Sequence, residues 1–340
     1  MYFKDFLCHR KVWLGFAIVW IILYHLPFAL PIGVFDWVKN IGYGGVDICL
    51  FASGIGCYYS LSSNSDVGVF IKKRFNRVMP TYWIFIVFWL VYKFVIGEFG
   101  WKMAIGNFFA VQYITGNGNE FNWYITAIII FYFLAPYFKI IADKKSLVLQ
   151  ISFLTFLVGI TIAFWNSTNI IITTVRLIIF YIGMIFGSVC KSDTKVSRWH
   201  ICFGVLMLVA GLLILRIFLK SDNRWSYGLH WYPFILITPP LCMVISLIAR
   251  LFDKTRVTKP IFKFLSLCGE YSFELYLIHI LLISIISMVI TKFNLVSFTW
   301  VAWLVGLIAL VILCFLLKKA TALSESLFLR VRSVIVKVKV

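Results

Sequence analysis

Long apolar runs separated by short polar segments make up most of the chain. Each run approaches the roughly 20 apolar residues that one membrane-spanning helix needs. The pattern therefore predicts an all-α polytopic membrane protein with about ten transmembrane helices. The runs occupy residues 12–30, 45–61, 81–96, 123–141, 147–164, 170–190, 201–219, 231–251, 272–290 and 298–317.

Basic residues follow the same segmentation. Most of the 32 Lys and Arg residues lie before the first run, in every second connection and after the last run. Connections rich in Lys and Arg stay in the cytoplasm. This distribution predicts that both termini are cytoplasmic. We expect residues 1–320 to form the membrane domain and residues 321–340 to form a basic cytoplasmic tail.

Composition narrows the class of protein further. Hydrophobic residues make up 62% of the 340 residues and charged residues only 13%, which is too little charge to cover a soluble protein. The 34 Phe and 13 Trp residues exclude intrinsic disorder. Because topology accounts for most of the net charge of +19, we expect no nucleic-acid partner. The eight Cys residues form no CxxC pair, so we expect no metal site.

Two ionisable side chains fall in the outer halves of the first two runs, and such residues are functional candidates by default. The imidazole of His25 is suited to proton transfer near neutral pH. Asp47 follows a glycine-rich segment at residues 42–45, and Gly54 and Gly56 favour close packing of the same helix. A short connection predicts an Asp47–His25 hydrogen bond that would orient the ring. Alternatively, Asp47 only caps its helix.

Further charged residues mark the inner side and the interior of the bundle. Arg74 and Arg77 are spaced i, i+3, so on a helix they share one face and can clamp phosphate groups. A cluster that faces anionic lipid is the simpler interpretation of these two residues. Arg176 lies deep enough in its run to need a partner carboxylate or a bound anion. Tyr276 and His279 also share a face, which fits either a structural pair or a ligand site.

In this order, the motifs resemble those of the acyltransferase 3 family of integral-membrane acyltransferases. The resemblance covers essentially the whole chain, and the motifs stand in register with the apolar runs. The glycine-rich segment, for example, is similar to the family signature G-x-G-G-V-D-x-F-F-x-x-S-G. The matching segments are Tyr24-His25, residues 42–54 (GYGGVDICLFASG), Arg74-Phe75-Asn76-Arg77 with Pro80, Asn122-Trp123-Tyr124, and residues 271–279 (YSFELYLIH).

The resemblance implies an enzyme of the bacterial cytoplasmic membrane that transfers an acyl group, most often acetyl, from cytoplasmic acyl-CoA to a hydroxyl of a cell-surface or lipid-linked glycan. Acyl-CoA is then a co-substrate, and no permanently bound cofactor is expected. The expected partners are the glycan acceptor and membrane lipids, and a homo-oligomer stays open. The implied residues are His25 as general base, oriented by Asp47; Lys11, Lys73, Arg74 and Arg77 around the CoA phosphates; and Arg176, His279, Tyr276, Ser53 and Trp123 around the substrate or the oxyanion.

Two departures from the family pattern bear on this site. The family usually has Arg or Lys eleven positions before the first-span His, where this chain has Leu14. Lys11 lies one turn earlier on the same helix face, so we expect its side chain to reach toward the donor. The fourth-run motif also lacks the acidic residue that many members carry, which places this chain nearer the shorter, single-domain relatives.

Two other functions stay open. A transporter built on the same membrane fold would bind a small molecule or an acyl group between helices broken in mid-membrane. Substrate uptake without any acyl donor would identify it. A structural subunit would use its intramembrane polar groups only for pairing between helices. In that case, changing His25 or Arg77 would leave glycan modification intact.

Overall fold

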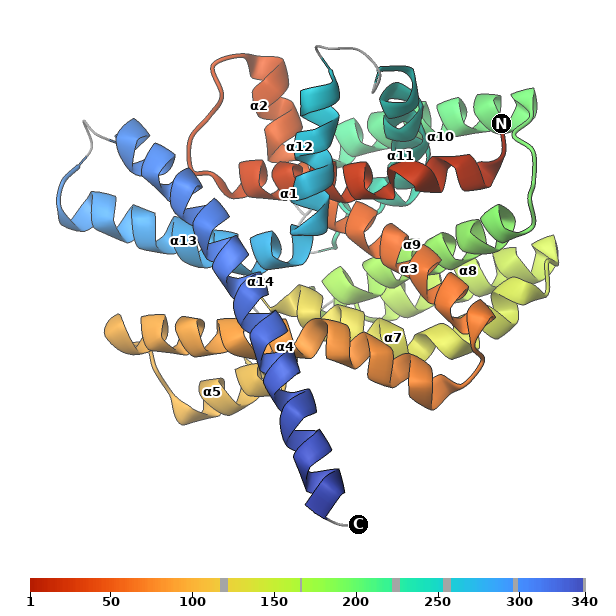
Figure 1. Ribbon diagram of the computed structural model, residues 1–340. Coiled ribbons are helices and arrows are strands. Elements are labelled where there is room, and N and C mark those ends of the chain that lie inside the picture. The colour runs from red at the N-terminus through yellow and green to blue at the C-terminus, as the bar shows by residue number, and fades with distance from the viewer. Residues whose placement is uncertain (117–121, 166, 222–226, 253–257, 296–298, 339–340) are drawn as a thin grey trace.

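The structure is a computed structural model that describes all residues except 117–121, 166, 222–226, 253–257, 296–298 and 339–340 (Figure 1). In the described residues all regular structure is helical, apart from one isolated β-bridge between Tyr2 and Lys195, so the predicted all-α class is confirmed. The helices are η1 (Phe3–His9), α1 (Arg10–His25), α2 (Gly33–Asn40), η2 (Gly42–Gly44), α3 (Gly45–Ser63), α4 (Val67–Val95), α5 (Trp101–Phe108), α6 (Gln112–Thr115), α7 (Trp123–Asp143), α8 (Leu147–Ala163), α9 (Thr168–Lys191), α10 (Arg198–Phe218), α11 (Pro233–Phe252), α12 (Lys259–Glu270), α13 (Ser272–Lys292) and α14 (Thr299–Val338).

Each predicted apolar run overlaps one of these helices. Among the described residues, eight helices are long and apolar enough to cross a membrane: η1 with α1, then α4, α7, α9, α10, α11, α13 and α14. A further span is formed if α2 and η2–α3, which are bent by 44° relative to each other, are taken together. The apolar helix α8 is shorter, at 17 residues. The chain is therefore a multi-pass membrane protein, as predicted.

The ends of the first and last spans differ from the predicted boundaries. α1 ends at His25 rather than at residue 30, because Leu26 has an extended backbone and Pro27 follows it. The imidazole of His25 consequently lies at the end of the helix rather than within it. α14 continues from Thr299 to Val338 without a break at residue 320.

The third span begins earlier than predicted. α4 starts at Val67, where the Asp66 carboxylate accepts a hydrogen bond from the Val69 N–H and caps the helix. It then runs through Pro80, so the basic segment before residue 81 is helical. Arg74 and Arg77 therefore lie one turn apart on the same helix.

α1 and α3 lie at the centre of the bundle. α3 packs along both α9 and α1, and α12 crosses α1 on another side (Figure 1). α10 pairs with α11, and α14 crosses both α13 and α4. The large side chains of Trp13 and Phe51 are fully buried between α1 and α3, and Phe180 of α9 is fully buried against α7. This packing holds α1 between α3 and α12 along most of its length.

Glycines allow the central helices to approach closely. A Cβ atom at Gly45 would overlap the carbonyl oxygen of Ala17 in α1. A Cβ atom at Gly54 would likewise overlap the carbonyl oxygen of Phe180 in α9. The prediction that Gly54 gives α3 a smooth packing face is confirmed, and the close contacts fix Asp47 between α1 and α9.

Candidate active site

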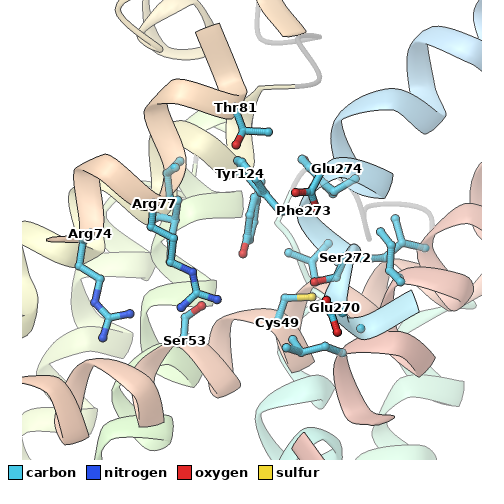
Figure 2. A pocket seen from close by; sticks show the side chains of 18 of the residues that line it. Cys49, Ser53, Arg74, Arg77, Thr81, Tyr124, Glu270, Ser272, Phe273 and Glu274 are labelled. Carbon is cyan, nitrogen blue, oxygen red and sulfur yellow. The ribbon is translucent and has the colours of Figure 1, made fainter. Parts of the chain in front are cut away.

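A polar cavity of about 220 Å³ lies between α1, α3, α4, α7, α12 and α13 (Figure 2). Along α1 its lining runs from Arg10 to Ile21, a rise of about 16 Å along the helix axis. Arg77, Ser53 and Tyr124 project into the same space (Figure 2). We call this space the polar cavity. It extends from the basic end of the bundle to within one helical turn of His25.

A second cavity, of about 560 Å³, meets the polar cavity at its basic end. Arg10, Arg74 and Arg77 line both spaces, and we call these three residues the arginine cluster. Lys73 also lines the second cavity. Three of the four residues expected around the donor, Lys73, Arg74 and Arg77, are therefore brought together.

Glu270 and Glu274 also line the polar cavity, but among the described residues no carboxylate lies within ion-pair distance of the arginine cluster. Arg74 donates from Nη2 to the Gly56 carbonyl at 2.6 Å, and Arg10 donates from Nη2 to the Ala52 carbonyl at 3.0 Å. The Nε atoms of both side chains are buried without a hydrogen-bond partner in the described part of the chain. No ion pair involves any member of the cluster among the described residues. Such a cluster is suited to bind phosphate groups.

Arg10 is absent from the residues expected at the site. It lies one helical turn before Leu14, and both side chains line the polar cavity. Gly56 leaves room for its guanidinium, since a Cβ atom there would lie 3.2 Å from Arg10 Nη2. The sequence did contain a signal for Arg10. The family usually has a basic residue at the position of Leu14, and Arg10 lies four residues earlier, on the same helix face.

Lys11 does not line either cavity, contrary to expectation. Its Nζ lies 3.1 Å from Glu270 Oε2, while Lys318 Nζ lies 3.2 Å from Glu270 Oε1. Hydrogen bonds from Lys11 and Lys318 hold the pKa of the Glu270 carboxyl below its usual value. Successive residues on a helix point about 100° apart, so Lys11 faces α12 and Arg10 faces the cavity. The ion pairs tie α1 and α14 to the end of α12.

Two tyrosines line the far end of the polar cavity. The ring centroids of Tyr124 and Tyr276 are 4.9 Å apart, and both residues line the cavity together with Ser53. The ring of Tyr276 also lies 5.7 Å from that of His279. Tyr276 and Ser53 are thus at the cavity as expected, and His279 lies behind Tyr276.

The two imidazoles of the expected site lie against each other. The ring centroids of His25 and His279 are 5.1 Å apart, in an edge-to-face arrangement. His25 Nδ1–H donates to the Ile21 carbonyl at 2.9 Å, and His279 Nδ1–H donates to the Tyr276 carbonyl at 2.7 Å. A carbonyl oxygen only accepts, so each neutral ring carries its proton on Nδ1 and a lone pair on Nε2. Each Nε2 can therefore take a proton.

Asp47 does not orient His25, so the predicted hydrogen bond between them is wrong. Its Oδ1 instead lies 3.8 Å from Arg176 Nε, and both side chains are almost fully buried. Asp47 begins α3 opposite α9, and the close packing of these two helices turns its carboxylate toward Arg176 rather than toward the end of α1. His25 takes its orientation from the Ile21 carbonyl instead.

The buried Arg176 and the half-buried Trp123 form a cluster outside the polar cavity. The guanidinium lies over the rings of Trp123 at 4.8 Å and Trp231 at 5.0 Å, and Arg176 is only 1% exposed. Neither Arg176 nor Trp123 lines the polar cavity. Arg176 therefore has the partner carboxylate that its depth demands, in Asp47.

The arrangement offers two kinds of chemistry. Cationic donors at one end can hold a phosphate-bearing molecule, and imidazole nitrogens near the other end can accept a proton. Within the described ranges, no three His, Cys, Asp or Glu residues are grouped so that they could hold a metal ion.

Comparison with known proteins shows the family of the chain. The model of a family described as an acyltransferase domain, of the acyltransferase 3 type, matches residues 15–319. No curated protein and no solved structure gave a match. The matched segment includes His25 and the residues that line the polar cavity, apart from Arg10 and Leu14. The chain therefore belongs to the acyltransferase 3 family.

Proposed function

We propose that the protein is a membrane-embedded O-acyltransferase of the bacterial cytoplasmic membrane. It transfers an acyl group, most often acetyl, from cytoplasmic acyl-CoA to a hydroxyl of a cell-surface or lipid-linked glycan. The observation that carries this proposal is the polar cavity, which joins the arginine cluster to Tyr276. The ring of Tyr276 contacts that of His279, which in turn contacts that of His25. A phosphate-binding site and proton-accepting imidazoles are thus connected in one membrane protein.

The donor enters from the basic end of the bundle. The phosphates of CoA bind the arginine cluster and Lys73, none of which forms an ion pair among the described residues. The pantetheine arm extends along α1, past Leu14 and Ile18, toward Ile21. This path spans about 16 Å, so the thioester arrives within one turn of His25.

His25 is the general base. Its Nε2 lone pair is available because Nδ1–H is bonded to the Ile21 carbonyl. It removes the proton from the acceptor hydroxyl as the oxygen attacks the thioester carbonyl. The C–O bond forms, the C–S bond breaks, and the imidazolium returns the proton to the leaving CoA sulfur. The phenols of Tyr124 and Tyr276 line the cavity where the oxyanion would develop.

The acceptor binds on the side of His25 that the expected topology places outside. A cavity of about 480 Å³ there is lined by Trp37, Tyr43, Arg216 and Lys220 among others. Aromatic faces with nearby cations and donors are suited to saccharides and their anionic groups. Tyr43 contacts Tyr24, and Tyr24 contacts His25, with ring centroids 5.5 and 4.9 Å apart. The saccharide thus lies close to the base.

One observation favours the transporter as a second candidate. The break of 44° between α2 and η2–α3 lies next to the buried Asp47–Arg176 pair, and broken helices with paired polar groups occur in transporters. Uptake of labelled acetate or glycan precursor into vesicles that contain no acyl donor would support this function over acyl transfer.

Surface glycans report the proposed function directly. A strain that lacks the chain is complemented with the wild-type protein, with His25→Ala, or with His9→Ala, which changes a histidine outside the cavities. Mass spectrometry of the glycans should show the added acyl mass with wild type and His9→Ala only. Full acylation with His25→Ala at equal protein level would contradict the mechanism.

A further inference from the structure

An apolar cavity of about 420 Å³ lies between α1, α12, α13 and α14, on the side of α13 away from the polar cavity. We call it the lateral cavity. It shares no lining residue with the polar cavity, since α1 turns Ile18 and Ile21 to one and Val19 and Ile22 to the other. Apart from Cys268 and His279, its lining consists of aliphatic and aromatic side chains and one glycine.

The lateral cavity is continuous with the lipid-facing surface of α14. Leu304, Leu307 and Val311 line it, and each of these residues is more than half exposed. From Trp300 to Val311 its lining rises about 16 Å along α14, roughly half of the hydrocarbon core of a bilayer. These dimensions suit a hydrocarbon chain that enters sideways from the membrane.

His279 is a polar residue in the otherwise apolar lining of the lateral cavity. The residue is 1% exposed and lines the lateral cavity. Its Nδ1–H is bonded to carbonyls of its own helix, and its Nε2 is buried without a partner among the described residues. A buried acceptor without a donor is costly, above all in a membrane. A hydrogen-bond donor, such as a hydroxyl on an otherwise apolar molecule, would satisfy this nitrogen.

We infer that the lateral cavity binds the hydrocarbon chain of a hydroxyl-bearing lipid, which places a hydroxyl on His279 Nε2 beside His25. This inference rests on the proposed function and specifies its acceptor, since a lipid-linked glycan has both a chain and hydroxyls. The chain of the acceptor then enters from the membrane, its saccharide lies toward the outer cavity beside Tyr43, and the donor arrives through the polar cavity on the other face of α1. The two substrates meet without crossing each other's path.

Photolabelling in lipid nanodiscs tests this binding without any acyl donor. Two probes carry the same benzophenone-tagged alkyl chain: one is an alkyl glucoside with hydroxyls, and the other is an alkyl phosphocholine without them. We expect the glucoside to label peptides of α13 and α14 more strongly, by about five- to tenfold, as one buried hydrogen bond would give. Equal labelling by both probes would show that the cavity holds only ordinary membrane lipid.

A matched pair of variants shows whether the label lies in the cavity. Leu307 and Ile308 are neighbours on α14 with exposures of 58% and 55%, but only Leu307 lines the lateral cavity. Leu307→Trp should reduce glucoside labelling severalfold, and Ile308→Trp should leave it unchanged. His279→Phe should remove the preference for the glucoside and keep labelling by the chain. Equal labelling of the two Trp variants would overturn the inference.

The outcome is separable from that of the proposed function. If the preference for the glucoside holds while glycan acylation in cells does not depend on His25, the lipid site stands and the acyl-transfer mechanism fails. If acylation depends on His25 but the glucoside shows no preference and no dependence on Leu307, the enzyme stands and its acceptor does not bind in the lateral cavity.

Discussion

The imidazole of His25, at the end of α1, lies edge-to-face against the imidazole of His279 in α13, with ring centroids 5.1 Å apart. Both rings keep Nε2 free of protein hydrogen bonds among the described residues, because Nδ1 of each is bonded to a backbone carbonyl. In the proposed mechanism His25 takes the proton of the attacking hydroxyl, and His279 accepts a hydrogen bond from another hydroxyl of the acceptor. The two residues should therefore differ in their effect on the rate.

Changing each imidazole separates these roles. General-base catalysis contributes about 10²- to 10⁴-fold, so we expect His25→Ala to lower kcat by at least about 100-fold. His279→Gln can still hold a hydroxyl and should mainly raise KM for the acceptor, by about tenfold. Steady-state kinetics with the purified enzyme measure both effects. If His279→Gln lowered kcat as much as His25→Ala does, the assignment of His25 alone as the general base would be contradicted.

Arg10 should bind the donor even though its neighbour Lys11 does not. A charge-assisted hydrogen bond lost in Arg10→Ala should raise KM for acyl-CoA about 10- to 100-fold. Lys11→Ala, which breaks only an exposed ion pair, should change this KM less than about twofold. The donor dependence of initial rates gives both values, and a larger effect of Lys11 would contradict the placement of the two side chains.

The Asp47–Arg176 pair should stabilise the fold rather than tune His25. Removing one partner of a buried ion pair costs about 3–5 kcal/mol, because the other charge stays buried. We expect Asp47→Asn and Arg176→Gln each to lower thermal stability in detergent, and the double variant to recover part of the loss. Strictly additive losses would show that the two side chains do not interact.

Glu270 should make the contact between α1, α12 and α14 sensitive to acid. Its two ammonium partners hold its pKa below the ordinary 4.5. Its contribution to stability is therefore complete above that ordinary value and is lost as the pH falls through the lower folded value. The difference in unfolding temperature between wild type and Glu270→Gln should be largest at pH 7 and shrink below about pH 4. A difference that is constant across this range would exclude the effect.

Much of the fold could be predicted because the length of an apolar run is a local property of the sequence. The ten runs, the helical class and the closely packed Gly54 depend on composition within about one helix. The first span was predicted to reach residue 30, but α1 ends at His25 because Pro27 follows. This proline lies inside the long apolar run of residues 12–30, so the run alone did not reveal the helix end.

Residue partners were harder to predict, because they depend on which faces the helices turn toward each other. Arg10 and Lys11 are adjacent in the sequence, yet one lines the polar cavity and the other pairs with Glu270. Asp47 is near His25 along the chain, but the close contact of α3 with α9 gives it Arg176. The lateral cavity depends on α13 and α14 packing beside α1, which no local pattern reveals.

Transfer from the cytoplasmic donor is tested most directly with inverted membrane vesicles, whose cytoplasmic face is outside. Vesicles with wild-type protein, His25→Ala or His9→Ala receive acetyl-CoA with a deuterated acetyl group, and the glycan fraction is analysed by mass spectrometry. We expect the deuterated acetyl mass with wild type and His9→Ala, and its loss with His25→Ala. Equal incorporation by the His25→Ala vesicles would contradict acyl transfer through this imidazole.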